Sequence, residues 1–348
     1  MELLYPYTSN MNNLGAKPEK LPSNQFDHFY KGGYRIGKLR NGPGGPMRPE
    51  EWIGSTTTRF GESVNGLSKL SDGRILKDVI NSDPLNWLGK AHIDKYGVSI
   101  EILVKLLDPD QRLPVHYHPD KKFAAENLHL NHGKTEAWII LEAPKGARVG
   151  LGFKQEMTKN EVSTLVKAHD SNTLLDLLTF IEVKAGDAIF VPAGVAHAIE
   201  SGIFVLELQE PTDLSILLEW DGFAVDGDKD GHLNLGYELA LDALRLTPLT
   251  DSERKEVVTR FEEASSKSQV IFNEIANSFF RADFLAGDDL EVEAGFGIFL
   301  CLTGEGHLEF NKTEKLSVKA GDAVVIPHSA GGFKLNGCKG IISRPPAA

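Results

Sequence analysis

The sequence predicts a mainly β protein built from two related β-barrel domains with a small helical portion. The first observation is a series of short apolar runs, rich in β-branched and aromatic residues and bounded by Gly and Pro, such as 136–142, 188–194 and 297–302. Short runs of this kind are typical of sandwiches and barrels. The second observation is a repeat: Val-Lys-Ala-Gly-Asp-Ala occurs at 183–188 and again at 318–323. Each copy leads into an apolar run and a proline, which indicates two copies of one β unit.

The length of 348 residues exceeds the roughly 250–300 residues that one hydrophobic core usually serves, so we expect more than one domain. We predict an N-terminal domain over 1–234, a helical segment over 235–280 and a C-terminal domain over 281–348; the motifs below make the first of these the candidate catalytic domain. Helical spacing of apolar residues predicts an insertion of helices at about 156–180 in the first domain. The same spacing predicts an amphipathic helix over 251–265.

Composition narrows the class of partner and the compartment. Lys and Arg number 37 against 49 Asp and Glu, for a net charge of -12, and an acidic chain is repelled by nucleic acid and by anionic membranes. No apolar run reaches the ~20 residues of a membrane span, and the N-terminus lacks the features of a secretory signal. Two cysteines, Cys301 and Cys338, are too few for a disulfide framework. We therefore expect a cytoplasmic protein that binds neither nucleic acid nor membrane.

Four residues have the pattern of a metal site. His116 and His118 are two apart, so on one strand they project to the same face. Glu136 begins a later apolar run, and His197 closes the pattern Gly-x5-Pro-x-Gly-x2-His over 186–197. Three imidazoles and one carboxylate suit Zn²⁺, Mn²⁺ or Fe²⁺, with a position left open for water or substrate. This arrangement resembles the signature of the cupin superfamily, which implies a double cupin of jelly-roll β-barrels.

The second copy of the repeat lacks these ligands. The offset between the copies places Gly332 where His197 stands, and Ser329 where Gly194 stands. No His-x-His precedes the second hexapeptide within its copy. We therefore expect the C-terminal domain to be a degenerate cupin with a structural role.

Longer stretches resemble the class I mannose-6-phosphate isomerases of the shorter bacterial kind. They are the segment 94–124, which leads into His-Pro-Asp; Gly-Lys-Thr-Glu-Ala-Trp at 133–138; the segment 174–199; and Gly-Glu-Gly-His-Leu-Glu-Phe at 304–310. The resemblance implies a reversible aldose–ketose isomerase that acts on a hexose or hexose 6-phosphate. It also implies one divalent metal per chain, for which we expect zinc, with manganese and iron as alternatives.

The family's functional residues transfer onto matching positions. The resemblance implies metal ligands at His116, His118, Glu136 and His197. It places an active-site lysine at Lys134 and an acidic residue at Glu207. Moving hydrogen between two carbons through an enediol needs a base for the carbon-bound proton and positive charge for the oxyanion. The metal or Lys134 is expected to supply that charge, and Glu207 or a neighbouring group the base.

Two positions depart from the family pattern. His116 stands where the family usually has glutamine, which adds a third nitrogen to the ligand set. Leu217 stands four residues after Asp213, where the family has arginine, and no Lys or Arg occurs between Lys184 and Lys229. The missing charge leaves an isomerase for an unphosphorylated sugar as an alternative.

Further residues are candidates for substrate binding. Glu219 and Trp220 place a carboxylate beside an indole, which is a frequent means of holding a sugar. The alternative is that Trp220 packs in the core and Glu219 is solvated. Two lysines after His-Pro-Asp are candidates for a phosphate, or else a solvated pair. The candidates are Lys121, Lys122, Asp213, Glu219 and Trp220.

Three functions fit the sequence. The first is the metal-dependent isomerase. The second is a non-catalytic sugar-binding or sensory cupin, because Leu217 replaces the arginine. The third is another cupin chemistry such as a dioxygenase, because the same ligands suit iron. We expect the first, with a small sugar or sugar phosphate as partner and a monomer or homodimer as the assembly.

Overall fold

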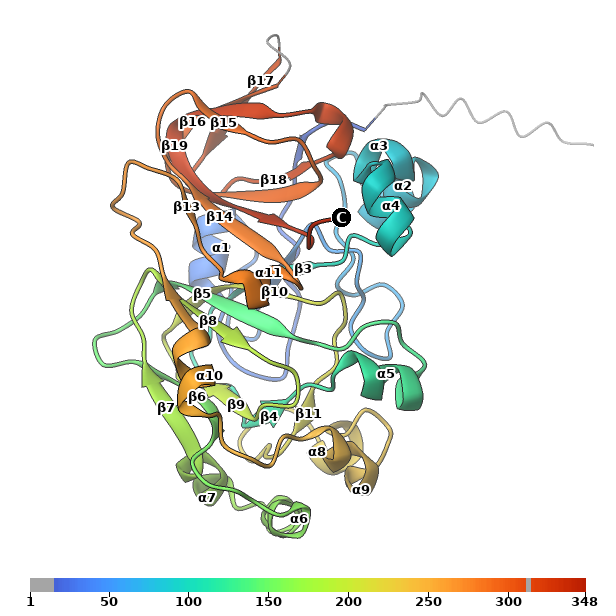
Figure 1. Ribbon diagram of the computed structural model, residues 1–348, viewed down its shortest axis with the longest axis vertical. Helices are drawn as coiled ribbons and strands as arrows, with labels where there is room; N and C mark the ends of the chain where they lie inside the picture. Colours follow the sequence, from blue (N-terminus) through green and yellow to red (C-terminus); the bar gives the residue numbers. More distant parts are fainter. Residues whose placement is uncertain (1–15, 311–313) are drawn as a thin grey trace, which may run out of the picture.

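The computed structural model describes residues 16–310 and 314–348. Its strands form three antiparallel sheets, which Figure 1 shows as an upper unit rich in C-terminal strands and a lower unit that carries most of the N-terminal ones. The prediction of a mainly β, double-barrel protein is confirmed. In the described part of the chain, no helix is long and apolar enough to cross a bilayer.

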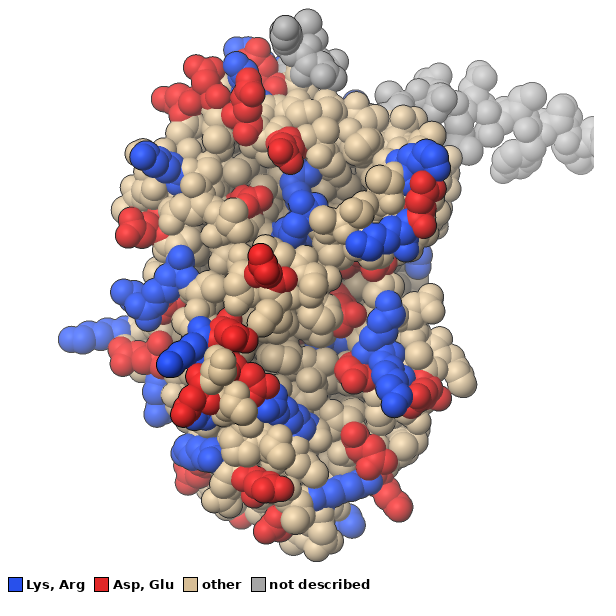
Figure 2. Space-filling view, in the orientation of Figure 1, with Lys and Arg blue, Asp and Glu red and all other residues tan. Residues whose placement is uncertain are grey.

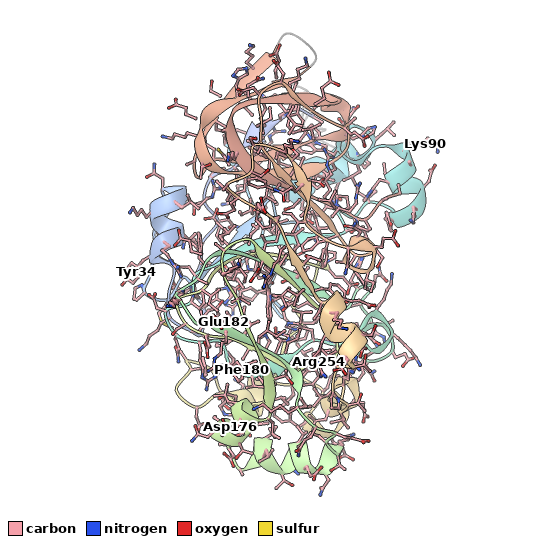
Figure 3. All side chains as sticks on the ribbon, turned by 60° about the vertical axis from the view of Figure 1, so that its left-hand side comes forward. Tyr34, Lys90, Asp176, Phe180, Glu182 and Arg254 are labelled. Carbon is pink, nitrogen blue, oxygen red and sulfur yellow. The ribbon has the colours of Figure 1, made fainter. Side chains whose placement is uncertain are left out.

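The lower unit is a barrel made of two sheets. The six-stranded sheet runs in the order β12 (Val258–Arg260), β8 (Asp187–Val191), β5 (Glu136–Glu142), β10 (Phe204–Gln209), β3 (Leu103–Leu107) and β2 (Glu50–Ile53). The five-stranded sheet runs in the order β11 (Ile216–Leu217), β4 (His116–Tyr117), β9 (His197–Ile199), β6 (Arg148–Phe153) and β7 (Leu178–Glu182). The edge strand β7, whose Phe180 and Glu182 are labelled in Figure 3, is mostly half-exposed.

The upper unit is one eight-stranded sheet. Its main path is β1 (Glu19–Lys20), β18 (Ala323–Ile326), β16 (Gly297–Phe310), β19 (Phe333–Arg344), β14 (Arg281–Leu285) and β13 (Gln269–Val270), with β15 (Leu290–Val292) on β19 and β17 (Glu314–Lys319) on β16. One hydrophobic cluster contains Val104 and Leu106 of β3 together with Ile298 and Leu300 of β16. The two units therefore share a core, and β3 is buried on both faces.

The helices are short and lie outside the sheets. They are α1 (Tyr34–Arg40), α2 (Leu76–Ser82), α3 (Pro84–Leu88), α4 (Lys90–Tyr96), α5 (Lys121–Leu128), α6 (Lys159–Lys167), α7 (Ser171–Asp176), α8 (Gly227–Asp230), α9 (Tyr237–Ala240), α10 (Asp251–Glu256) and α11 (Glu274–Asn277). The helices predicted at about 156–180 are present as α6 and α7. Thr158 and Glu161 form a reciprocal capping box at the start of α6, which satisfies two free N–H groups.

The helix predicted over 251–265 ends early. α10 stops at Glu256, and the next residues form β12, in which Val258 pairs with Ile189 of β8. The β-branched residues Val257, Val258 and Thr259 favour an extended chain. Pairing with the edge of the six-stranded sheet therefore outweighs the helical spacing of the sequence.

The repeated hexapeptide forms the same turn in both units. In the first copy the Asp187 carboxylate accepts the Lys184 N–H at 3.0 Å, and in the second the Asp322 carboxylate accepts the Lys319 N–H at 3.0 Å. The glycine between them has a φ of 87° at Gly186 and is likewise left-handed in the second copy. A Cβ at Gly186 would lie 2.4 Å from the Phe261 carbonyl oxygen. Left-handed backbone and close packing both require glycine here.

Strand pairs cross the predicted domain boundaries. β1 pairs with β18 at the far end of the sequence, and β12, in the segment 235–280, pairs with β8. β13 of the same segment pairs with β14. The boundaries at 234 and 280 stay a prediction, while the pairing shows that each unit draws strands from more than one of the three predicted parts.

A buried ion pair fixes the N-terminal segment to the upper unit. Arg40 Nε donates to Glu51 Oε1 at 2.8 Å, Nη2 donates to the Leu21 carbonyl at 3.0 Å, and Nη1 donates to the Gly321 carbonyl. The side chains of Arg40 and Glu51 are 3% and 0% exposed. The guanidinium therefore joins α1, β2 and the repeat turn of the C-terminal unit.

Arg40→Ala is expected to lower the free energy of unfolding by about 3–5 kcal/mol, because it leaves the Glu51 carboxylate buried without its partner. The measurement is the urea midpoint at unchanged slope. Arg74→Ala, which removes a pair with exposed Asp72, is the matched control and is expected to change the midpoint little. Equal effects of the two substitutions would contradict this reading of the Arg40 contacts.

Candidate metal centre

The inner face of the six-stranded sheet carries a row of large and charged side chains. Trp52 of β2 pairs with Lys105 of β3, Lys105 pairs with Glu207 of β10, and Glu207 pairs with Trp138 of β5. Residues directly opposite each other in a sheet share a face. Both charged residues of the row are almost fully buried. The sheet therefore presents a lysine and a carboxylate to the barrel interior.

The predicted metal ligands meet across that interior. His116 of β4 lies directly opposite His197 of β9 in the five-stranded sheet, and His118 follows two residues after His116 on the same face. Glu136 is the first residue of β5 in the facing sheet. His197 Nε2 lies 3.3 Å from Glu136 Oε1, and His118 Nε2 lies 3.0 Å from Glu136 Oε2. All four side chains predicted as ligands come together.

The imidazoles are oriented by backbone carbonyls. Nδ1 of His116, of His118 and of His197 lies 2.7–2.8 Å from the carbonyl oxygen of Pro114, Leu214 and Val195, respectively. A carbonyl only accepts, so each Nδ1 carries the proton and each Nε2 presents a lone pair to the interior. Carbonyl partners of this kind are usual behind metal-bound histidines.

The arrangement of lone pairs fits a cation. His116 Nε2 and His197 Nε2 lie 3.0 Å apart, and one ring nitrogen from each of the three histidines lies within 4.8 Å of the others. Burial, followed for His118 by the nearby Lys134 ammonium, lowers the pKa of His118 to about 3, and burial also lowers the pKa of His116 and His197. Neutral lone pairs this close repel one another, and among the described residues Glu136 Oε2 accepts no hydrogen bond. A divalent ion removes both penalties.

Lys134 stands next to the predicted ligands. Its Nζ lies 3.2 Å from His118 Nε2, 3.4 Å from Ser215 Oγ and 3.5 Å from Glu136 Oε2. The backbone before it packs tightly, since a Cβ at Gly133 would lie 2.5 Å from the Asp120 carbonyl carbon. Lys134 lies two residues before Glu136, the first residue of β5, and its ammonium reaches the same side of the chain as the Glu136 carboxylate.

The two buried glutamates differ in protonation. Burial opposes ionisation of Glu136, but His118 and the Lys134 ammonium hold its pKa well below the usual range. Burial, reinforced by the Glu136 charge, raises the pKa of Glu207 to about 7 although Lys105 opposes the shift. Lys105 Nζ lies 3.5 Å from Glu207 Oε1, which accepts no hydrogen bond from the described residues. Glu207 is therefore placed to exchange a proton near neutral pH.

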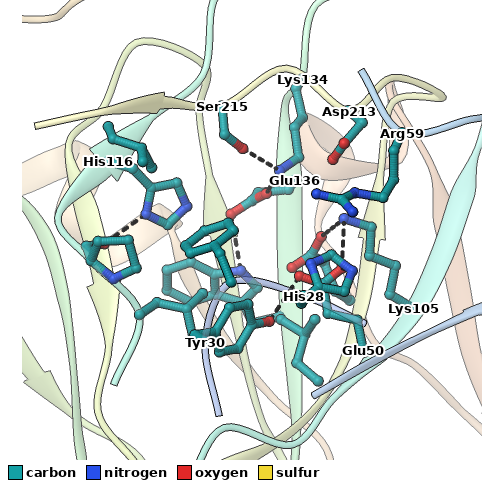
Figure 4. Close-up of a pocket in the computed structure, with 17 residues that line it drawn as sticks. His28, Tyr30, Glu50, Arg59, Lys105, His116, Lys134, Glu136, Asp213 and Ser215 are labelled. Atoms are coloured by element: carbon teal, nitrogen blue, oxygen red, sulfur yellow. Dashed lines mark hydrogen bonds and ion pairs between the residues drawn. The ribbon is translucent and has the colours of Figure 1, made fainter. Parts of the chain in front are cut away.

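The barrel interior around these residues forms a pocket, which we call the chamber (Figure 4). The sequence analysis missed a second set of residues that line it. Glu50 accepts hydrogen bonds from the Tyr30 hydroxyl and from Trp52 Nε1, each at 2.8 Å, and lies 3.5 Å from Lys105 Nζ. His28 and Arg59 complete this wall. For Lys105 a signal existed, because it is a single charge within the apolar run 102–107.

The weaker substrate-binding predictions divide into two groups. Asp213 lines the chamber. Glu219 is buried and bonded to Arg112 and to the Val115 N–H, and Trp220 stacks on Tyr237 with ring centroids 5.8 Å apart. The two lysines that begin α5, Lys121 and Lys122, are exposed. The structure does not bring these last four side chains into the chamber.

Comparison with known proteins agrees with this geometry. A family model described as phosphomannose isomerase type I, catalytic domain, matches residues 48–146. The mannose-6-phosphate isomerase ManA of Bacillus subtilis is 30% identical over 246 residues, which cover 69% of this chain and 73% of that protein. The chain belongs to the mannose-6-phosphate isomerase family. A mannose-6-phosphate isomerase of Streptococcus mutans is 27% identical over 283 residues, 80% of this chain and 84% of that protein.

Solved structures share the fold. A putative mannosephosphate isomerase from Archaeoglobus fulgidus superposes with a TM-score of 0.73 at 19% identity and covers 96% of this chain and 99% of its own. The mannose 6-phosphate isomerase of Bacillus subtilis superposes with a TM-score of 0.72 at 23% identity, over 94% and 99% of the two chains. Family membership makes the protein an isomerase and does not favour the non-catalytic sugar-binding alternative.

Proposed function

We propose that the protein interconverts mannose 6-phosphate and fructose 6-phosphate with one zinc ion. The observation that supports this most is the buried set of three lone pairs and one carboxylate beside Lys134, in a chain of this family. His116, His118, Glu136 and His197 would hold the ion. Zinc is the metal of choice because it favours imidazole-rich, four-coordinate sites, and manganese or iron would also accept these ligands. When bound, the ion supplies a Lewis acid that polarises a substrate oxygen.

The proton transfer is assigned to residues of the chain. Glu207 accepts the proton from C2 of the open-chain aldose and returns it to C1, while the hydroxyl proton on O2 passes to O1. Lys134 donates a hydrogen bond to the oxygen on which negative charge develops, and Ser215 Oγ, 3.4 Å from Nζ, orients the ammonium. A base with a pKa near the working pH is the most effective one.

The chamber is lined by buried apolar side chains, which favours the proposed proton transfer. Trp138 and Leu113 line it together with the charged groups, and the tryptophan is 1% exposed. Excluding water strengthens the hydrogen bonds that hold the developing charge. The fixed side chains therefore replace solvent around the reacting carbons.

We also propose that the enzyme works in the cytoplasm as a monomer or homodimer. Its two cysteines are free and buried, as suits a reducing compartment. Figure 2 shows acidic and basic side chains interspersed on the face in view. Gel filtration with light scattering measures the assembly, and a stable higher oligomer would contradict the proposal.

A turnover screen tests the function. The zinc-loaded protein is expected to form fructose 6-phosphate from mannose 6-phosphate, and chelation is expected to lower the rate by about 100-fold or more. Adding zinc back restores it. The panel includes glucose 6-phosphate, mannose and glucose in deuterated water. If the metal-loaded protein forms no ketose and moves no solvent deuterium into any of these sugars, the proposed function is wrong.

A further inference from the structure

The chamber opens into a larger cleft. Its own volume is about 90 Å³, and that of the adjoining cleft is about 520 Å³. Sites for small molecules usually occupy about 300–1,000 Å³. A substrate whose reacting carbons lie beside Lys134 and Glu136 therefore extends its far end into the cleft. The two spaces share the residues Phe29, Arg59, Asp213, Ser215 and Leu217.

Arg59 is the basic residue at this junction. Among the described residues that line the cleft it is the single Lys or Arg, beside the acids Asp213, Asp226 and Asp230. The other two cations of the chamber are engaged: Lys105 lies between Glu50 and Glu207, and Lys134 adjoins the metal ligands. Arg59 is also paired, with Glu62, but this pair is about one third exposed whereas the pairs of the two lysines are buried, so Arg59 is the cation best placed for a negative group of the substrate.

The guanidinium has free donors. Nη1 lies 3.2 Å from Glu62 Oε1 and donates to the Asp27 carbonyl at 3.4 Å, and the side chain is 30% exposed. Within residues 16–310 and 314–348, Nε and Nη2 of Arg59 have no hydrogen-bond partner. A guanidinium with two free N–H groups matches the oxygens of a phosphate.

The loop that carries Arg59 is held in place. The Arg59 N–H donates to the Asn65 carbonyl at 2.9 Å, and the Phe60 N–H donates to Asp213 Oδ2 at 3.1 Å. Gly66 has a φ of 100°, and a Cβ there would lie 2.5 Å from the Trp52 ring. The loop therefore packs on β2 and presents Arg59 without further ordering, which favours binding.

We propose that Arg59 binds the phosphate group of the substrate at the mouth of the chamber. This inference rests on the proposed function and adds a specificity residue to it. The substrate lies with C1 and C2 among the metal ligands, Lys134 and Glu207, and with its phosphate on Arg59. Asp226 and Asp230 disfavour the phosphate in the outer cleft. Asp213 shares the junction with Arg59, where its carboxylate accepts the Phe60 N–H.

Arg59→Gln tests the proposal. The KM for mannose 6-phosphate is expected to rise by about 10- to 100-fold, as for loss of hydrogen bonds to a charged group, with kcat changed by less than about threefold. Competitive inhibition by inorganic phosphate is expected to weaken by a similar factor. Arg59→Lys, which keeps the charge but not the planar fork, is expected to recover part of the affinity.

Arg48→Gln is the matched control, because Arg48 is a half-exposed arginine of the same N-terminal segment, paired with Asp27, and does not line the chamber. Zinc content and thermal midpoint are measured for each variant. The inference is overturned if Arg59→Gln leaves both the KM and the inhibition by phosphate unchanged. It is also overturned if the substitution lowers the thermal midpoint and kcat while the KM stays unchanged. Failure of the wild-type protein to convert mannose 6-phosphate is a separate result, which overturns the proposed function.

Discussion

Replacing His197 by alanine is expected to abolish stoichiometric zinc binding and to lower kcat/KM for mannose 6-phosphate by about 1,000-fold or more. His197 Nε2 lies 3.0 Å from His116 Nε2 and 3.3 Å from Glu136 Oε1, so its loss opens the ligand set on two sides. The metal supplies several kcal/mol of charge stabilisation, and each 1.36 kcal/mol is a factor of ten in rate. Zinc content by mass spectrometry and steady-state kinetics measure the two effects.

His307→Ala is the control for this variant, since His307 lies on β16 of the upper unit, away from the chamber. It is expected to keep one zinc and wild-type kinetics. His197→Gln retains most of the volume and serves if the alanine variant does not fold. A His197 variant with one tightly bound zinc and undiminished turnover would show that the four residues are not the metal site.

Glu207→Gln is expected to lower kcat by about 10²- to 10⁴-fold, the range for loss of a general base, with little change in KM. The amide keeps the shape and the place opposite Lys105 and Trp138 but accepts no proton from carbon. Zinc content is expected to stay at one per chain, which separates this effect from loss of the metal. Glu200→Gln, which removes a surface pair with Arg148, is the control.

The pH profile gives Glu207 a second test. Burial raises its pKa to about 7, and a base acts in its ionised form. The kcat of the wild-type enzyme is therefore expected to fall as the pH drops below about 7 and to level off above it. Glu207→Gln is expected to lose this acid limb. A wild-type profile that is flat from pH 5 to 8, or a limb that persists in the variant, would assign the proton transfer to another group.

The sequence predicted the parts of the site that local spacing decides. His116 and His118 share a face because they are two apart, and this holds for any strand, so it needs no knowledge of the fold. Lys134 came from the resemblance to the family and not from spacing, since it precedes the first residue of β5. His197 followed from the spacing of a turn whose glycines the structure shows in left-handed conformation, at φ values of 87° and 83° for Gly186 and Gly194.

The other wall of the chamber was not predictable in this way. Glu50, His28 and Arg59 have no spacing in the sequence that links them to Lys105. The pairing of β2 with β3 brings Glu50 to Lys105, and the fold adds His28 and Arg59. Glu219 is the converse case, because it was predicted to bind substrate and does not line the chamber. Its chemistry suits a sugar, but its buried bonds to Arg112 and the Val115 N–H depend on a chain segment about a hundred residues away. Sequence shows what a side chain is able to bind and not what the fold has already placed beside it.

The pairing of β1 with β18 bears on how the enzyme is made. Lys20 and Asp322 bond at 2.7 Å although 302 positions separate them in the chain, and Arg40 reaches the turn at Gly321. The ribosome releases β1 and Arg40 long before β18 and Gly321, so the segment that carries His28, Glu50 and Arg59 lacks these partners until they have been synthesised. Contacts this distant in sequence form slowly. A nascent chain that stops before β18 would hold its predicted metal ligands without a finished chamber, so we expect no catalysis until β18 has been synthesised.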